Sequence, residues 1–204
     1  MNARVPHLLW DAEAGYGYCP ARAIDYGISY WEEFRRRDQT DIGRALTASR
    51  VALVRQFAPD DAPLVDVGIG GGAFVEARPG TLGTDVCYQA RKWLAERGSL
   101  WEHYRHGPSN LAMWDVLEHL PDAAEFLLES VVAGGLLFAA LPIFGGRDHA
   151  LRSRHFKPGE HLWYWTEGGF ASWLRAIGFD VLPTDRVEEQ WREDILRVVA
   201  RRVP

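Results

Sequence analysis

The sequence predicts an α/β fold in which a mostly parallel sheet carries helices on both faces. Apolar stretches of strand length alternate along the chain with amphipathic stretches of helix length, which is the pattern of parallel strands joined by helices. The segment Leu136 to Pro142 is a nearly continuous apolar run, as expected for a strand buried on both faces. The 204 residues, 47% of them hydrophobic, suit one domain with a sizeable core.

The first 40 residues differ in character from the rest. Residues 1–28 mix glycine, proline and aromatic residues without a period, and their tyrosines are too many for a disordered tail, so we expect an arm packed on the body. Ser29 to Glu32 matches a capping box, which predicts the start of a short helix. We therefore divide the chain into residues 1–40, the arm with its short helix, and residues 41–204, the main domain.

The other elements are predicted from caps, glycine stops and apolar runs. Thr40 or Asp41 can cap a helix whose inward residues are Ile42, Leu46, Leu53, Val54 and Phe57. Further helices are predicted over Gln89–Arg97, over Pro121–Ala133 with Phe126, Leu127, Val131 and Val132 inward, and from Thr166 to Gly178. Strands are predicted over Leu100–Tyr104 and Asn110–Val116, and an antiparallel closing pair over Phe179–Leu182 and Ile195–Ala200, with residues 145–165 as a loop.

A strand over Leu64 to Val67 leads into three glycines at alternate positions, Gly68, Gly70 and Gly72. Such a turn lets the backbone approach a ligand without a Cβ in the way, and a helix that follows points free N–H groups at it. That helix has room for little more than one turn, because Pro79-Gly80 interrupts it. The turn is either a nucleotide-type cofactor site or a glycine-rich turn without a ligand.

A second strand over Thr81 to Val86 ends in Asp85, 17 positions after Gly68, close to the interval at which an acid reaches a ribose hydroxyl. Gly68-x-Gly70-x-x-Ala73 matches the nicotinamide dinucleotide fingerprint. Asp66-x-Gly68-x-Gly70-x-Gly72 matches the first motif of the S-adenosylmethionine (SAM) fold. Asp66 favours SAM, because a carboxylate there can pair with the cationic methionine end of this cofactor and would repel a pyrophosphate.

The segment Trp114 to Asp122, WDVLEHLPD, resembles the motif after the fourth strand in class I SAM-dependent methyltransferases of the ubiquinone-biosynthesis-like group. The glycine motif, Asp85, this motif and the closing strand pair appear in that family's order, over about residues 40 to 203. His155 to Thr166 resembles a compact bacterial and phage-type branch. The resemblance implies the Rossmann-like class I methyltransferase sheet, so residues 41–204 are expected to be a SAM-binding methyltransferase domain.

The resemblance also implies cofactor roles. Asp66, Gly68, Gly70 and Gly72 would hold the methionine end of SAM, and Asp85 would accept both ribose hydroxyls. Val86 would line the adenine, and Asp115 and Leu117 would complete the cofactor site. The chain departs from the family in its short first helix and in the short segment from Gly98 to Asn110, where Glu102 is the sole carboxylate to read the adenine.

The catalytic candidates are two histidines. His119 is either the base that takes the acceptor's proton or a brace of its loop. His161 is expected to face it across the substrate and to orient the acceptor, while His155 is a candidate substrate contact or a lid brace. Trp163, Tyr164 and Trp165 either stack on a flat substrate or are core aromatics behind a lid. Glu118 is expected to be a solvated acid at a helix start.

These observations favour a SAM-dependent methyltransferase acting on an oxygen or nitrogen of a small molecule. A non-catalytic SAM-binding or assembly protein and a nicotinamide-dependent oxidoreductase are the alternatives. A net charge of −5 with dispersed Lys and Arg argues against duplex nucleic acid as a partner. The two distant cysteines predict no metal site and a cytoplasmic location, and no apolar run is long enough to span a membrane.

Overall fold

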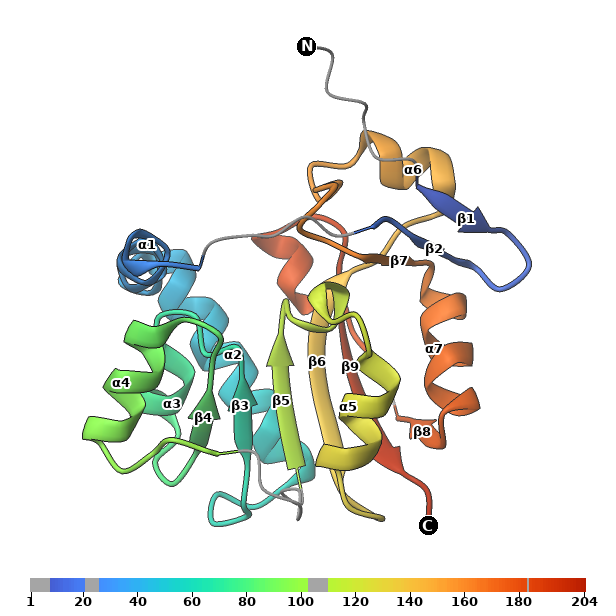
Figure 1. Ribbon diagram of the computed structural model, residues 1–204. Helices are drawn as coiled ribbons and strands as arrows, with labels where there is room; N and C mark the ends of the chain where they lie inside the picture. The colour runs from blue at the N-terminus through green and yellow to red at the C-terminus, as the bar shows by residue number, and fades with distance from the viewer. Residues whose placement is uncertain (1–7, 21–25, 103–109, 183) are drawn as a thin grey trace.

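The computed structural model describes residues 8–20, 26–102, 110–182 and 184–204, and places them in two sheets with flanking helices (Figure 1). The larger sheet has six strands in the order β4-β3-β5-β6-β9-β8, and the smaller has three in the order β1-β2-β7. Within the described residues, no helix is long and apolar enough to cross a membrane.

The larger sheet is the one that the sequence predicts. Its strands β4 (Leu82–Thr84), β3 (Val65–Val67), β5 (Asn110–Trp114) and β6 (Leu136–Pro142) run parallel. β9 (Ile195–Arg202) pairs antiparallel with β6 and with β8 (Phe179–Val181), which confirms the antiparallel closing pair. Every residue of β6 is buried, as its apolar run predicts.

The side chains of β6 alternate between two cores, one on each face of the sheet. Leu137, Ala139 and Leu141 pack with residues of α5 (Ala123–Ser130) and α7 (Glu167–Ala176). Leu136, Phe138 and Ala140 pack with α2 (Asp41–Phe57) on the opposite face. Burial on both faces therefore explains why this strand lacks the polar alternation of a half-exposed one.

Two of the predicted helix caps are confirmed and one is wrong. The hydroxyl of Thr40 accepts the Gly43 N–H at the start of α2, and the hydroxyl of Thr166 accepts the Gly169 N–H at the start of α7. Helix α1 (Ile28–Asp38) is instead preceded by Gly27 and has no side-chain cap, so the predicted capping box at Ser29 does not form. Two residues expected inward are exposed: Ile42 (50%) and Val132 (40%).

The smaller sheet joins the N-terminal arm to a distant part of the chain. β1 (Leu9–Asp11) and β2 (Tyr16–Tyr18) form a hairpin whose second strand pairs antiparallel with β7 (Trp163–Trp165). The prediction of a loop over 145–165 is therefore wrong in part, because this segment contains α6 (Arg147–Arg152) and β7. Figure 1 shows the small sheet beyond the carboxyl ends of β5 and β6.

The short elements follow glycine positions. Helix α3 (Ala73–Ala77) has the single turn predicted for it, and α4 (Tyr88–Glu96) ends just before Gly98, whose φ is +64°. The predicted strand over Leu100–Tyr104 reduces, in its described part, to one bridge between Leu100 and Gly83; Tyr104 lies outside the described residues. The 3-10 turns η1 (Leu117–His119) and η2 (Val187–Gln190) complete the main domain.

Adjacent glycines in α7 give a direct test of how the arm docks. A Cβ on Gly169 would lie 2.1 Å from the Gly15 carbonyl oxygen, whereas a Cβ on Gly168 would meet no described atom within 4 Å. We predict that Gly169→Ala lowers the free energy of unfolding by about 1–3 kcal/mol through overpacking against backbone. Gly168→Ala is the matched control and should stabilise by up to about 1 kcal/mol through helix propensity. Denaturant unfolding measures both, and equal effects would contradict this docking.

Candidate functional site

Acidic residues stand where three neighbouring parallel strands end. Asp66 is the middle residue of β3, Asp85 follows β4 and Asp115 follows β5. Because β4, β3 and β5 run in the same direction, these side chains gather at one edge of the sheet. Ligands of open α/β sheets bind at this carboxyl edge, so the sequence-predicted cofactor residues are brought together there.

The glycine turn at this edge has a left-handed backbone. Gly68, Gly70 and Gly72 have φ values of +72°, +55° and +84°, which favour glycine over residues with a Cβ. The turn is also closely covered, since a Cβ on Gly70 would lie 2.9 Å from the Phe34 ring of α1. The Arg35 guanidinium donates to the Gly71 carbonyl at 2.9 Å. Helix α1 therefore forms one wall beside the turn.

The carboxylate of Asp66 is buried and has no hydrogen-bond partner among the described residues. Its side chain is 1% exposed, and neither carboxylate oxygen has a hydrogen-bond partner within the described part of the chain. Burial raises the pKa of Asp66 well above its usual value, and the nearby Asp85 and Asp38 raise it further, against the opposing charge of Arg50. A cationic ligand group beside Asp66 would satisfy both oxygens.

Asp85 lies beside the glycine turn and is 9% exposed. One of its oxygens accepts the Cys87 N–H at 2.8 Å. Burial raises the pKa of Asp85, while backbone N–H groups, first that of Cys87 and then that of Gly70, lower it. The next side chain, Val86, is 77% exposed, so an apolar surface next to the Asp85 carboxylate is free to contact a flat ring.

Asp115 is held in a four-residue charge network. Its backbone has φ +61°, and Arg192 donates to its two carboxylate oxygens at 2.8 and 2.5 Å. Arg50 donates to Asp115 at 3.3 Å and to both oxygens of the fully buried Glu188 at 2.8 and 2.9 Å. Although burial opposes it, the two arginines bring the pKa of Asp115 well below its usual value. Leu117, 1% exposed, packs in the core under this network.

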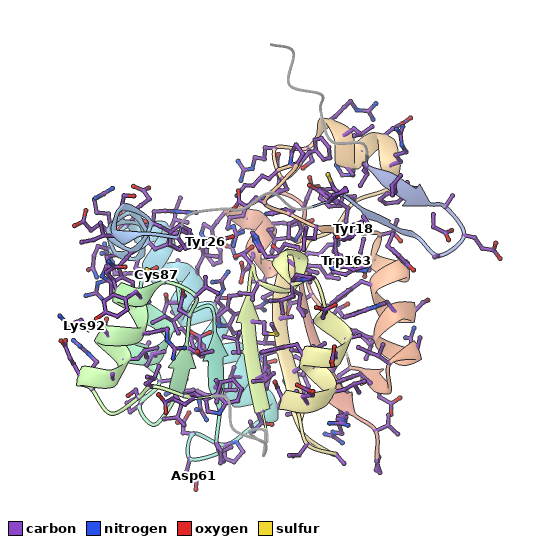
Figure 2. All side chains as sticks on the ribbon, viewed as in Figure 1. Tyr18, Tyr26, Asp61, Cys87, Lys92 and Trp163 are labelled. Carbon is purple, nitrogen blue, oxygen red and sulfur yellow. The ribbon has the colours of Figure 1, made fainter. Side chains whose placement is uncertain are left out.

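Several residues of the site were not found from the sequence. Arg50 lies on α2 and its partner Glu188 is 138 positions away, so no local pattern could join them. Tyr26 and Tyr30 pack edge to face at 4.9 Å. Burial raises the pKa of both, with Asp85 adding to the effect. Figure 2 shows Tyr26 between α1 and the upper end of β5.

The two catalytic candidates are in direct contact. The rings of His119 and His161 meet edge to face with centroids 4.7 Å apart, so the expectation that they face each other across a substrate is wrong. His119 Nδ1 lies 3.1 Å from the Glu160 carbonyl oxygen, which can only accept, so Nδ1 carries the proton and Nε2 a lone pair. Burial lowers the pKa of His119; burial and then His119 lower the pKa of His161 to about 2.

Glu118 is buried, which corrects the expectation of a solvated acid. Its side chain is 1% exposed, and both carboxylate oxygens are without hydrogen-bond partners among the described residues. Burial first, and then the negative charge of Asp115, raise the pKa of Glu118 well above its usual value. Its Oε1 lies 4.0 Å from the free nitrogen, Nε2, of His119.

The residues predicted to bind the substrate are mostly buried or hydrogen-bonded to backbone carbonyls. Tyr164 and Trp165 are 0% and 1% exposed, which supports the alternative of core aromatics for both. Trp163 donates from its indole N–H to the Leu120 carbonyl at 2.8 Å and stacks on Trp165. His155 is hydrogen-bonded through Nε2 to the Glu193 carbonyl at 3.0 Å, and burial lowers its pKa. Trp163 and Tyr18, labelled in Figure 2, lie side by side.

Neither the protein-family models nor the curated proteins contain a match to this chain. Solved structures are similar over most of it. One belongs to the complex between the Haloferax volcanii Trm112 methyltransferase activator and a methyltransferase, with TM-score 0.64 and 14% identity over 85% of this chain and 98% of that chain. A SAM-dependent methyltransferase from Thermotoga maritima, a possible histamine N-methyltransferase, gives TM-score 0.61 and 14% identity over 85% and 97%. The [4+2]-cyclase SpnF gives 0.59 and 14% over 81% and 83%.

At these identities the similarity establishes the fold, and this fold is the class I SAM-dependent methyltransferase fold that the motifs of the sequence predict. The cyclase among the similar structures shows that the fold carries more than one chemistry. Function therefore has to be argued from the residues at the carboxyl edge.

The burial of Asp66 makes a prediction about pH. Its pKa is raised in the folded state, so above about pH 4 the unfolded chain has released a proton that the folded chain keeps. Stability from this group is consequently lost as pH rises toward the raised pKa, by up to about 1.4 kcal/mol per pH unit. Asp66→Asn removes this loss, so the stability of the variant relative to the ligand-free parent should increase between about pH 5 and pH 8. Denaturant unfolding at both values measures it, and a pH-independent difference would contradict the burial of Asp66.

Proposed function

We propose that this protein binds SAM and transfers its methyl group to an oxygen or nitrogen of a small-molecule acceptor. The observation that carries the proposal is the unpaired, buried carboxylate of Asp66 in β3. A buried carboxylate costs folding free energy unless a cation or hydrogen-bond donor meets it, and the ammonium group of SAM is both. A pyrophosphate offers no positive charge to pair with Asp66, which disfavours a nicotinamide cofactor.

The remaining cofactor contacts follow along the edge. The turn at Gly68, Gly70 and Gly72 would pass beneath the methionine end, and the Asp85 carboxylate would accept the two ribose hydroxyls. The exposed Val86 would pack on the adenine. Two of the similar structures support SAM as the cofactor of this fold, since DhpI was determined with S-adenosylhomocysteine and the glycopeptide N-methyltransferase MtfA with SAM.

Methyl transfer is an in-line displacement in which the acceptor's lone pair forms a bond to the methyl carbon as the carbon–sulfur bond breaks. The sulfur keeps the bonding pair and leaves as the neutral thioether S-adenosylhomocysteine. The protein's main task is to hold the two reactants in line and to exclude water. In our proposal the acceptor enters beside η1, between Tyr26 and the Trp163 indole.

We assign activation of the acceptor to His119. Its ring is neutral near pH 7, since burial lowers its pKa, and its Nε2 lone pair is held in place by the bond from Nδ1 to the Glu160 carbonyl. His161 supports the orientation of His119 by ring contact. In this scheme the arm of residues 1–40 forms a wall of the site through α1, while residues 41–204 hold the cofactor.

The cofactor assignment predicts the effect of Asp85→Asn. The variant keeps the shape of the side chain and removes the charge that two ribose hydroxyls would share, so binding of SAM and S-adenosylhomocysteine should weaken by about 1.5–3 kcal/mol. Asp180→Asn, at an exposed position on β8, is the matched control and should bind as the parent does. Isothermal titration calorimetry measures both; binding of NAD in place of either SAM-type ligand would contradict the assignment.

The catalytic assignment predicts that His119→Ala lowers turnover by about 10²–10⁴-fold, the usual contribution of a positioned acid–base group. Affinity for SAM should stay within a few-fold, because His119 is not among the residues assigned to the cofactor. His149→Ala, in the exposed part of α6, is the control and should keep full turnover. The acceptor is first identified by incubating metabolite extracts with labelled SAM. A variant without His119 that turns over at the parent rate would remove it from the mechanism.

A further inference from the structure

Three potential ligand side chains converge where η1 meets the segment that leads into β7. Glu118 and His119 come from η1, and His161 comes from the segment before β7. One carboxylate oxygen and one nitrogen of each ring lie within 4.8 Å of one another. We propose that Glu118, His119 and His161 bind a divalent transition-metal ion. This goes beyond methyl transfer and does not depend on which acceptor the protein uses.

The first argument is that these side chains have polar atoms with nothing to bind. Both oxygens of Glu118 and Nδ1 of His161 are buried and lack hydrogen-bond partners in the part of the chain that the structure describes. The two residues are 1% and 3% exposed, so water does not readily replace those partners. Buried polar atoms without partners destabilise a fold. Coordination to a cation would satisfy the carboxylate and both rings at once.

The second argument is the orientation of His119. Metal-binding histidines almost always donate their other ring N–H to a carboxylate or a backbone carbonyl, which fixes the tautomer and aims the free nitrogen at the metal. His119 has this arrangement already, because Nδ1 lies 3.1 Å from the Glu160 carbonyl and Nε2 lies 4.0 Å from Glu118 Oε1. The same bond leaves the Nε2 lone pair of His119 for a metal ion. With the ion bound, this lone pair no longer takes the acceptor's proton, and the cation activates the acceptor instead.

The third argument is that hydrogen bonds join the two ligand-bearing segments. The Leu162 N–H donates to the Glu118 carbonyl at 2.7 Å, and the Trp163 indole donates to the Leu120 carbonyl at 2.8 Å. Along the chain these bonds flank His119 and directly follow His161, so binding would require side-chain rotation rather than movement of a loop. The site is therefore largely organised in advance.

The distances and donor types define the ion. Zinc bonds of about 2.0–2.1 Å in tetrahedral geometry place neighbouring ligand atoms about 3.4 Å apart. The cluster, at up to 4.8 Å, would contract by up to about 1.4 Å. Two imidazoles and one carboxylate suit Zn²⁺, Fe²⁺ or Co²⁺, whereas Mg²⁺ and Ca²⁺ prefer oxygen ligands throughout. Three protein ligands leave a coordination position open, as in catalytic sites.

The open coordination position of the proposed metal ion faces the side from which a substrate could enter. The His119 side chain is 20% exposed and is the least buried of the three, so it marks the side from which another ligand would arrive. This is the side on which the acceptor is proposed to bind. An oxygen or nitrogen of the acceptor, bound at that position, would lose its proton more readily because the cation stabilises the anionic form.

The test is metal binding by the whole, chelator-treated protein. We expect one equivalent of Zn²⁺ to bind in calorimetry, and Co²⁺ to give the intense visible absorption of a tetrahedral or five-coordinate site. Glu118→Gln and His161→Ala should each weaken Zn²⁺ binding by about 100-fold or more, since even loss of an outer-shell partner costs 10–100-fold. His149→Ala is the matched control, because this exposed histidine beside Asp194 (3.3 Å) is the obvious surface site for an adventitious ion.

The outcomes are distinct. Loss of binding in Glu118→Gln, with circular dichroism and S-adenosylhomocysteine affinity unchanged, would support the site even if His161→Ala does not fold. Absence of Zn²⁺ binding by the parent protein would overturn the proposal. So would binding that persists in Glu118→Gln but is lost in His149→Ala, or a weakly absorbing octahedral Co²⁺ spectrum. Because S-adenosylhomocysteine is titrated separately, failure here leaves the proposed cofactor site to be judged by its own test.

Discussion

The main physical constraint on the carboxyl edge of this sheet is the free-energy cost of burying several acidic side chains. Asp66 lies within β3, Asp85 and Asp115 directly follow the neighbouring strands β4 and β5, and Glu118 comes three residues after Asp115. Transfer of carboxylates into a protein interior is costly unless each finds a cation or hydrogen-bond donors. Some of these acids have a cation or hydrogen-bond donor within the protein, and others have none among the described residues. We interpret the first group as structural and the second as candidate ligand-binding groups.

The carboxylate of Asp115 is paired with positive charges. With Glu188 it is paired to Arg50 and Arg192, so the network ties α2, the end of β5 and the segment before β9 together. Both carboxylate oxygens of Asp115, whose side chain is 29% exposed, are engaged by arginines, so the network holds Asp115 in place. The network therefore fixes the position of η1, and with it the positions of Glu118 and His119.

The carboxylates of Asp66 and Glu118 are buried without such partners among the described residues. Asp66 lies within β3 and Glu118 in η1 after β5, each is 1% exposed, and neither carboxylate has a hydrogen-bond partner within the described residues. In both places a cation would complete the structure: the ammonium group of SAM beside Asp66 and, in our further proposal, a metal ion beside Glu118. The cofactor and the acceptor would then be held by the same physical principle at adjacent points of one edge.

The sequence predicts the local parts of this arrangement well. The alternating glycines, the caps at Thr40 and Thr166 and the apolar run of β6 each carry a short-range signal, and the structure confirms them. Pairings between distant segments carry no such signal. The hairpin that pairs with β7 and the Arg50–Glu188 pair each join residues about 140 positions apart, so neither was predicted. For the same reason the burial of Glu118 and the contact of its neighbour with His161 became apparent only in the folded chain.

A crystal structure of the protein with S-adenosylhomocysteine would test the central claim most directly. Our account predicts ligand density along the carboxyl edge, with the amino group within hydrogen-bond distance of Asp66, the ribose hydroxyls on Asp85 and the adenine against Val86. Density for the ligand at another place, or an Asp66 carboxylate that stays buried and unpaired while the ligand is bound, would contradict it.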